Sequence, residues 1–477
     1  MAQADRVETG RKVWAPWYTL HKVYAGLIDM YTLCGNEQAL KIALGMARWA
    51  RQRTDRLDEA QMQKMLGVEH GGINDALRNL YAVTGDPELL ALARRFDHKA
   101  VLDPLAAHED RLKGLHVNTQ IPKVIGAARA YELTGESCFH DAATYFWNQV
   151  TAARCYAAGG TSNDEHWRTE PYRMASELGR ESHETCCTYN MLRLTRHLFT
   201  WNPEARYADY YERALFNGIL ATQDPANGMM MYYVPMASGF YKTFMTPEDS
   251  FWCCTGTGME NHAKYGDSIY FHDESGLFVN LFIASELDWI ERGIRIRQET
   301  SFPEEANTKL IVRTGRPAEF ALKVRIPSWV APGGKAVLNG KPLEAFSSPG
   351  SHLVLKRTWR DGDTLLIDLP MKLYLERLPD DADTAAILYG PLVLAGDLGS
   401  ERLTADKVLG PMGPSGEAVA VPRLAGDRRQ LDSWIKQVPG KILTFRTVGA
   451  GRPDDVTLVP FYKLFGCRYA IYWELRN

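Results

Sequence analysis

The sequence predicts an α + β multidomain protein, in which an array of helical hairpins precedes a β-sandwich. Two features carry this prediction: a helical pattern that repeats every fifty residues in the first half, and short strand-like segments from about residue 275 onward. At 477 residues the chain is too long for one hydrophobic core. We therefore expect a helical-hairpin domain over residues 1–272, a β-sandwich over 273–398, and an irregular stretch with a C-terminal β unit over 399–477.

The helical repeat consists of pairs of amphipathic segments. A tyrosine and, four residues later, a glycine end the first segment of each pair, at Tyr31 and Gly35, Tyr81 and Gly85, and Tyr131 and Gly135. Glycine at this position typically terminates a helix, and a polar stretch then begins the next one. A period of this length is typical of stacked helical hairpins. A fourth pair over residues 188–220 lacks the glycine, so the sequence predicts about eight helices.

The segments after residue 275 are short, rich in valine and leucine, and separated by proline, glycine and asparagine. They read GLFVNLFIASELDW, TKLIVRTG, AEFALKVRIPSW, KAVLNGKPL, HLVLKRTW and DTLLIDLP. Several alternate apolar and polar residues, as strands with one buried face do. We expect these segments to form the β-sandwich, and we place the second, smaller β unit after the irregular stretch 399–440.

Composition and charge exclude two classes of partner. The net charge of −3 leaves no excess of lysine and arginine for a nucleic acid or an anionic membrane surface. No apolar run is long enough to span a bilayer. The start of the chain, MAQADRVETGRK, lacks the apolar region of a signal peptide. We therefore expect no nucleic acid and no membrane among its partners, and the sequence predicts no particular oligomeric state.

The eight cysteines are too few for a scaffold of disulfides in a chain of this length. Four of them stand apart from one another in apolar surroundings: Cys34, Cys138, Cys155 and Cys467. Free cysteine is among the most frequently buried residue types, so we predict that these four are small core residues.

The other four cysteines form two adjacent pairs, Cys186 with Cys187 and Cys253 with Cys254. A strained disulfide between neighbours, two buried apolar thiols and a metal site are the three interpretations. Glu184 stands two residues before the first pair, and Zn²⁺ binds thiolates and carboxylate oxygens in a tetrahedron. Glu184 and Cys186 turn toward one point if this stretch is extended or begins a helix. The second pair precedes TGTG, which we expect to be a flexible loop.

A zinc site made of Glu184, Cys186, Cys253 and Cys254 would use four protein ligands and leave no position for a zinc-bound water. The metal would then be structural, or one of the ligand sulfurs would itself be the reactive group. Zinc keeps a thiolate deprotonated at neutral pH, which is one way to prepare a nucleophile. The residues alone leave both possibilities open.

Polar residues suitable for a sugar pocket lie at several turns of the helical half. The loop GGTSNDEHW (159–167) carries Asp164 and Glu165, and His70 and His116 each stand just before a helix of the repeat. The two histidines occupy corresponding places in successive hairpins, so both can line the same end of the array. A solvated loop and capping histidines are the alternatives. The aromatic stretches WAPWYTLHK and MMYYVPM suit a sugar pocket and equally suit core packing.

Several longer motifs carry a resemblance to a known family. They are EHGGINDALRNLYAVTGD, HVNTQIPKVIGAARAYELTG, GGTSNDEHW, ETCCTYNMLRL and FWCCTGTGMENHAKYGDSIYF. These motifs resemble the β-L-arabinofuranosidases of glycoside hydrolase families 127 and 146, and are more similar to those of 146. The resemblance runs over most of the chain, from about Val13 to the ending VPFYKLFGCRYAIYW.

The resemblance implies a fold and a set of site residues. The fold would be an (α/α)₆-type barrel followed by β-sandwich modules. The family's nucleophile falls on Cys253 and its general acid/base on Glu165. The implied zinc ligands are Glu184, Cys186, Cys253 and Cys254. The implied sugar-contacting residues are His70, His116 and Tyr233. Cys187 is expected to be a neighbour of the zinc ligands and not a ligand itself.

The implied activity is that of a retaining glycoside hydrolase that releases β-L-arabinofuranose from plant glycans or glycoproteins. The same machinery acting on another pectin-side-chain sugar is one alternative, and a catalytically impaired, zinc-structured glycan-binding fragment is the other. Family members carry a long segment upstream of WAPWYTLHK, so we expect the barrel to be incomplete at the N-terminus. A targeting signal would lie in that segment, and the sequence therefore predicts no compartment.

Overall fold

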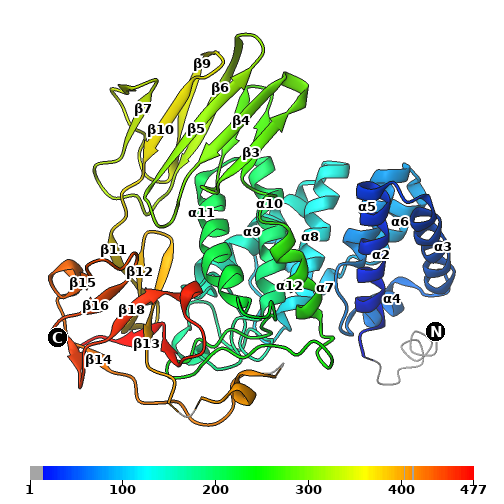
Figure 1. Ribbon diagram of the computed structural model, residues 1–477. Helices are drawn as coiled ribbons and strands as arrows, with labels where there is room; N and C mark the ends of the chain where they lie inside the picture. The colour runs from blue at the N-terminus through cyan, green and yellow to red at the C-terminus, as the bar shows by residue number, and fades with distance from the viewer. Residues whose placement is uncertain (1–13, 402, 411–412, 477) are drawn as a thin grey trace. The chain divides into compact units, whose positions relative to one another are not determined.

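The computed structural model describes residues 14–401, 403–410 and 413–476, and helices precede strands along the chain (Figure 1). The α-helices of these described residues are α2 (Pro16–Cys34), α3 (Glu37–Thr54), α4 (Glu59–Leu66), α5 (Ile73–Thr84), α6 (Pro87–Arg95), α7 (Lys99–Ala106), α8 (Val117–Thr134), α9 (Ser137–Ala153), α10 (Thr185–Trp201), α11 (Ala205–Ala214) and α12 (Cys253–Ala263). The prediction of a mixed helical and β multidomain protein is confirmed. The estimate of about eight helices was too low, because it missed α4, α7 and α12.

The chain forms two compact units. The first comprises the described residues up to Arg154, together with Glu165–Pro171 and Asn190–Leu198. The second comprises Cys155–Asp164, Tyr172–Tyr189 and the described residues from Phe199 onward.

The predicted helical hairpins are present in the first unit as the pairs α2–α3, α5–α6 and α8–α9. The glycine after the first helix of each pair is left-handed, with φ of 67° at Gly35, 72° at Gly85 and 72° at Gly135. Its backbone N–H donates to the carbonyl of the tyrosine four residues earlier in all three cases. A residue with a Cβ adopts this conformation only with strain, so glycine here ends each helix. The repeat predicted from the sequence is thus confirmed at its helix ends.

The second unit contains two sheets that share one hydrophobic core. One sheet has the order β1 (Tyr270–Asp273), β2 (Gly276–Val279), β6 (Ala318–Ile326) and β9 (Ser351–Trp359). The other has the order β3 (Ser285–Trp289), β4 (Ile294–Glu299), β5 (Asn307–Thr314), β10 (Thr364–Asp368), β7 (Lys335–Leu338) and β8 (Lys341–Pro342). Alternate residues of both sheets meet in the core, including Val324 of β6 and Ile296 of β4.

A third, larger sheet follows in the chain. Its strands are β11 (Leu373–Leu378), β12 (Asp381–Tyr389), β13 (Leu392–Asp397), β15 (Ile435–Gln437), β16 (Phe445–Thr447), β18 (Thr457–Pro460), β19 (Tyr469–Ala470) and β20 (Tyr472–Glu474), and a separate pair joins β14 (Arg423–Leu424) to β17 (Gly451–Arg452). Residues on both sides of the expected boundary at 398/399 therefore belong to one sheet. This pairing favours a boundary near residue 372, between β10 and β11.

The isolated cysteines differ from the prediction. Cys34 and Cys138 are exposed, while Cys155 and Cys467 are partly buried. Cys34 is the last residue of α2, and Cys138 lies in the first turn of α9. These two helix ends are open to solvent, so the prediction of four buried core residues was wrong for Cys34 and Cys138.

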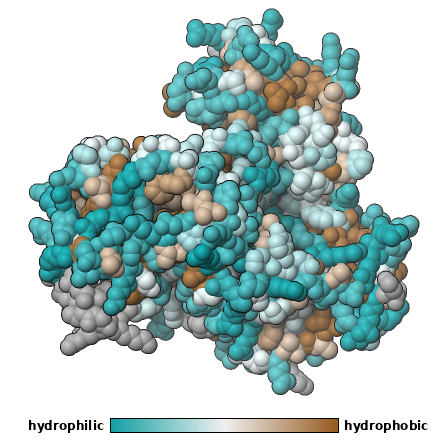
Figure 2. All heavy atoms as spheres, turned by 180° about the vertical axis from the view of Figure 1, so that it is seen from behind, coloured by the Kyte–Doolittle hydropathy of each residue, from teal (hydrophilic) through white to brown (hydrophobic). Residues whose placement is uncertain are grey.

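No helix among the described residues is long and apolar enough to cross a membrane. The face shown in Figure 2 is largely hydrophilic, with smaller hydrophobic patches distributed over it.

Candidate metal centre and active site

The cysteine pairs lie at the starts of two helices, at positions that belong to the second unit. Cys186 is the second residue of α10, and Cys253 and Cys254 are the first two residues of α12. The side chains of Glu184, Cys186, Cys253 and Cys254 each offer one ligand atom, and these atoms lie within 4.8 Å of one another. We call these four residues the thiol–carboxylate group. The structure therefore brings together the four residues that the resemblance implied as zinc ligands.

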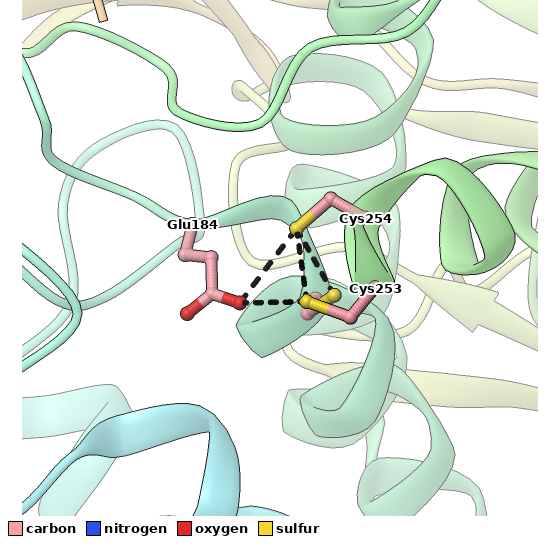
Figure 3. A group of neighbouring side chains, drawn as sticks. Glu184, Cys253 and Cys254 are labelled. Atoms are coloured by element: carbon pink, nitrogen blue, oxygen red, sulfur yellow. Dashed lines mark hydrogen bonds between the residues drawn. The ribbon is translucent and has the colours of Figure 1, made fainter. Parts of the chain in front are cut away.

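The geometry of the thiol–carboxylate group fits a tetrahedral ion. Figure 3 shows one carboxylate oxygen of Glu184 directed at the sulfurs of Cys253 and Cys254. Glu184 Oε1 lies 3.9 Å from Cys253 Sγ and 3.6 Å from Cys254 Sγ. The Sγ atoms of Cys253 and Cys254 are 3.9 Å apart, and those of Cys186 and Cys254 are 3.0 Å apart. Sulfurs bound to one zinc at about 2.3 Å lie about 3.8 Å from each other, so only small shifts are needed.

Burial of the group calls for a compensating positive charge. Glu184, Cys186 and Cys254 are fully buried, and Cys253 is partly buried. Burial raises the pKa of the Cys186 and Cys254 thiols well above their usual range. A divalent cation reverses this effect, because thiols that bind it are deprotonated. The donor set of three sulfurs and one carboxylate suits zinc.

The position of α12 corrects the expectation of a flexible TGTG loop. Residues 253–263 form a helix, so TGTG lies inside its first turns. Thr257 Oγ1 lies 3.1 Å from Cys186 Sγ, and a Cβ on Gly258 would come within 2.3 Å of Met230 Sδ. The small residues therefore allow close packing beside the sulfurs. Both cysteine pairs thus stand at helix N-termini, where the backbone favours negative charge.

The backbone around Glu184 fixes the position of this carboxylate. Its N–H donates to Ser162 Oγ at 3.1 Å, and its backbone pairs with Tyr233 in an isolated antiparallel bridge. His183, directly before it, is fully buried with φ of 53°. A Cβ on Gly160 would come within 1.9 Å of the His183 ring, so only glycine fits beside it. The turn that presents Glu184 is therefore tightly packed.

Two neighbouring tyrosines lie beside the thiol–carboxylate group. Tyr233, predicted to contact the sugar, is buried and is held by the backbone bridge to Glu184. Tyr232 is the one whose hydroxyl approaches the candidate nucleophile, with 3.9 Å between Tyr232 Oη and Cys253 Sγ. Sequence reasoning missed Tyr232, although the adjacent aromatic pair in MMYYVPM was a usable signal.

Glu165 lies in the first unit beside His116. Glu165 Oε2 is 3.4 Å from His116 Nε2, and the two side chains are partly exposed. Its carbonyl accepts a 2.7 Å hydrogen bond from the N–H of Val117, the first residue of α8. Glu165 has φ of 63° and Asp164 has φ of 47°, a conformation uncommon for non-glycine residues. Such strain is typical of functional turns.

His70 precedes α5 and is buried, with its Nδ1 3.2 Å from the carbonyl oxygen of Val68. Its Nε2 has no hydrogen-bond partner among the described residues. His116 directly precedes α8, and α5 packs against α8. His70 thus lies three residues before α5 and His116 one residue before α8, so the two histidines differ in position relative to their neighbouring helices, and their role in sugar binding stays a prediction.

A buried lysine near His70 was missed by sequence reasoning. Lys123 of α8 donates to Gln120 Oε1 at 2.9 Å, and its Nζ lies 3.1 Å from His98 Nδ1. Burial lowers the pKa of Lys123 to about 7. The rings of His70 and His98 are 5.4 Å apart between centroids.

The predicted site residues fall into two sets. Glu165, His70 and His116 belong to the first compact unit, and the thiol–carboxylate group and Tyr233 belong to the second.

Comparison with known families assigns most of the chain. The family model of the β-L-arabinofuranosidase catalytic domain of glycoside hydrolase family 127 matches residues 1–267, and the model of that family's middle domain matches residues 276–371. Residues 374–475 match a domain family of unknown function.

Individual relatives agree with this assignment. The non-reducing end β-L-arabinofuranosidase of Bifidobacterium longum subsp. longum is 25% identical over 83% of this chain and 70% of its own length. The crystal structure of a family 127 β-L-arabinofuranosidase from Geobacillus stearothermophilus T6 is 18% identical, with a TM-score of 0.71 over 96% of this chain and 79% of that one. A second solved family 127 β-arabinofuranosidase is 19% identical, with a TM-score of 0.74 over 96% of this chain and 76% of that one.

The likeness to these structures shows that the chain has the mixed helical and β fold of known glycoside hydrolases. Because the catalytic-domain model matches more than half of its residues, the chain belongs to glycoside hydrolase family 127, the family of β-L-arabinofuranosidases. The family resemblance predicted from the sequence is confirmed at this level.

Proposed function

We propose that this chain is a retaining glycoside hydrolase that releases β-L-arabinofuranose from plant glycans or glycoproteins. The observation that carries the proposal is the convergence of the thiol–carboxylate group within 4.8 Å, inside a segment that matches the family's catalytic domain. The name of the curated relative supports action on the non-reducing end of a glycan.

In the first step, Cys253 Sγ attacks the anomeric carbon while Glu165 donates its proton to the leaving glycosidic oxygen. The bond between the anomeric carbon and that oxygen breaks, and a thioglycosyl-enzyme forms. In the second step, the Glu165 carboxylate takes a proton from water, whose oxygen attacks the anomeric carbon and displaces the sulfur. Two inversions at one carbon give net retention.

The thiol–carboxylate group would hold a zinc ion, which when bound supplies the charge that keeps thiols ionised and lowers the basicity of a leaving sulfur. The N-terminus of α12 acts in the same direction on Cys253, since the backbone N–H groups of the first turn favour an anion. The Cys253 thiol donates to Tyr232 Oη at 3.9 Å, so the Tyr232 hydroxyl lies beside the same sulfur.

The remaining site residues are proposed to bind the sugar or its acid. His116 lies 3.4 Å from the Glu165 carboxylate and would hold it toward the glycosidic oxygen. His70 offers an Nε2 that is unpartnered among the described residues, a suitable group for a sugar hydroxyl. Tyr233 is anchored beside Glu184 by a backbone bridge and would contact the sugar there.

We further propose a subfamily, a barrel and sandwich architecture, and domain boundaries for this chain. The motifs quoted from the sequence support a position nearer to family 146. The helical hairpins support an (α/α)₆-type barrel, and the two sheets with a common core support a β-sandwich. We propose domain boundaries near 272 and 372, the second moved from 398 because β11–β13 pair with later strands.

Hydrolysis of chromogenic arabinosides by the purified chain tests the proposed function. We expect release from a β-L-arabinofuranoside, little from its α-anomer, and none from the Cys253→Ala variant. Faster release from another pectin-side-chain sugar would assign the same machinery to that sugar. Glycan binding without hydrolysis of any substrate would contradict the enzymatic proposal and favour a binding fragment.

A further inference from the structure

Cys187 is the one member of the two cysteine pairs outside the thiol–carboxylate group. It is fully buried and is the third residue of α10. Its Sγ donates to Glu184 Oε2 at 3.4 Å, and its backbone N–H donates to the carbonyl oxygen of Glu184 at 3.0 Å. Cys187 therefore contacts Glu184 twice: its thiol meets the side-chain carboxylate, and its N–H meets the backbone carbonyl.

The two oxygens of Glu184 face different partners. Oε1 lies 3.6 Å from Cys254 Sγ and 3.9 Å from Cys253 Sγ, whereas Oε2 receives the Cys187 thiol. In Figure 3 the second oxygen points away from the labelled sulfurs. A carboxylate that binds a metal through one oxygen needs a donor on the other to fix its rotation.

We propose that Cys187 is a positioning residue for the metal centre: its thiol holds Glu184 Oε2 so that Oε1 alone faces the metal. This inference rests on the proposed zinc site and deepens it, because it assigns a role to a residue that the sequence indicated only as a neighbour. Outer-shell partners of this kind typically contribute roughly 10–100-fold in metal affinity.

Zinc affinity of the full-length protein, measured by competition with a chromogenic chelator, tests the proposal. We expect Cys187→Ala to bind zinc about tenfold more weakly or worse. Cys187→Ser keeps an O–H donor of similar size and should recover most of the affinity. Cys155→Ala is the matched control, because Cys155 Sγ also donates to an oxygen, the Tyr156 carbonyl, at 3.4 Å and lies outside the thiol–carboxylate group.

Parent-like zinc affinity in Cys187→Ala, or an equal loss in Cys155→Ala, would reduce Cys187 to a packing role and overturn the proposal. Cobalt-substituted protein separates positioning from ligation. The thiolate-to-cobalt charge-transfer absorption should keep its parent intensity in Cys187→Ser, and a drop would make Cys187 a ligand.

The outcome is independent of the substrate. Chelator competition requires no sugar. A failure to hydrolyse arabinofuranosides would therefore contradict the proposed activity and leave the role of Cys187 intact. A parent protein that binds no zinc would overturn the role of Cys187, whatever the enzyme hydrolyses.

Discussion

The sulfur of Cys186 at the start of α10 lies 3.0 Å from the sulfur of Cys254 at the start of α12, although the two residues are 68 positions apart in the sequence. Each belongs to a pair of adjacent cysteines in the first turn of its helix. One cysteine of each pair, Cys186 and Cys254, therefore brings its sulfur into contact with the sulfur of the other helix. The other members differ in surroundings: Cys253, the proposed nucleophile, belongs to the thiol–carboxylate group, whereas Cys187 contacts Glu184 from outside it.

Zinc should co-purify with the chain at about one ion per molecule, and Cys186→Ser or Glu184→Gln should lose it. Both substitutions should also lower the free energy of unfolding, because the remaining buried thiols lose the cation that compensates them. Elemental analysis together with urea unfolding checks both effects. Active, folded protein without metal would rule out the zinc site.

Glu165→Gln should reduce turnover by roughly 10²–10⁴-fold while zinc content and unfolding stay at parent values. The substitution removes the proton donor and leaves the thiol–carboxylate group untouched. A substrate with a very good leaving group should lose less in the first step, since its departure needs no proton. Asp164→Asn, at the adjacent acid, is the control and should keep most of the turnover; the opposite ranking would move the acid/base to Asp164.

Lys123 should make stability depend on pH. Burial lowers its pKa from an ordinary 10.5 to about 7, so between these values the unfolded chain binds a proton that the folded chain does not. The free energy of unfolding should therefore rise with pH above about 7, by up to about 1.4 kcal/mol per pH unit. Below about pH 7 both states are protonated and this dependence disappears.

The Lys123→Met variant isolates the effect, because it keeps the volume and removes the titrating group. Urea unfolding of parent and variant between pH 6 and 9 should show a difference that moves in favour of the parent as pH rises. A difference that is constant over this range would mean that Lys123 keeps an ordinary pKa.

Arg325 of β6 should be essential for stability. It is fully buried, and its guanidinium contacts Asp209 Oδ1 at 2.6 Å, Glu212 Oε1 at 2.5 Å and the carbonyl oxygen of Asn280 at 2.7 Å. Arg325→Met would leave two carboxylates of α11 without their cation, at a cost of about 3–5 kcal/mol. Arg295→Ala, which breaks an exposed pair with Asp288, should leave urea unfolding nearly unchanged. Equal effects of the two variants would contradict this assignment.

The helical hairpins could be predicted because the residues that end their helices are recognisable from the local sequence. Gly35, Gly85 and Gly135 adopt the left-handed conformation that glycine favours, and this preference needs no knowledge of the rest of the chain. The alternating segments after residue 275 carry equally local information, since a strand with one buried face repeats every two residues.

Other features depended on contacts distant in sequence and could not be predicted in this way. TGTG contains two glycines, which weaken helices, yet α12 forms because Gly258 packs against Met230 and Thr257 meets Cys186. The environment of Lys123 depends on His98, which lies directly before α7. Local preference alone would have assigned a loop to the first segment and an exposed charge to the second.

The site residues also differ in whether local sequence was enough to predict them. The spacing of Glu184 and Cys186 was enough to suggest a ligand pair, because one residue before a helix and one in its first turn lie close together. The donor from Cys187 to Glu184 required the actual side-chain directions, which a sequence does not reveal.

The central claim is that Cys253 is the nucleophile, and covalent labelling tests it most directly. Intact protein would be treated with an arabinofuranose-configured electrophile and mapped by peptide mass spectrometry. We predict one adduct, on Cys253, that is absent from the Cys253→Ser variant even though that variant keeps three of the four residues of the thiol–carboxylate group. An adduct on Glu165 or another carboxylate, with Cys253 unmodified, would contradict the claim and leave the cysteines with a purely structural role.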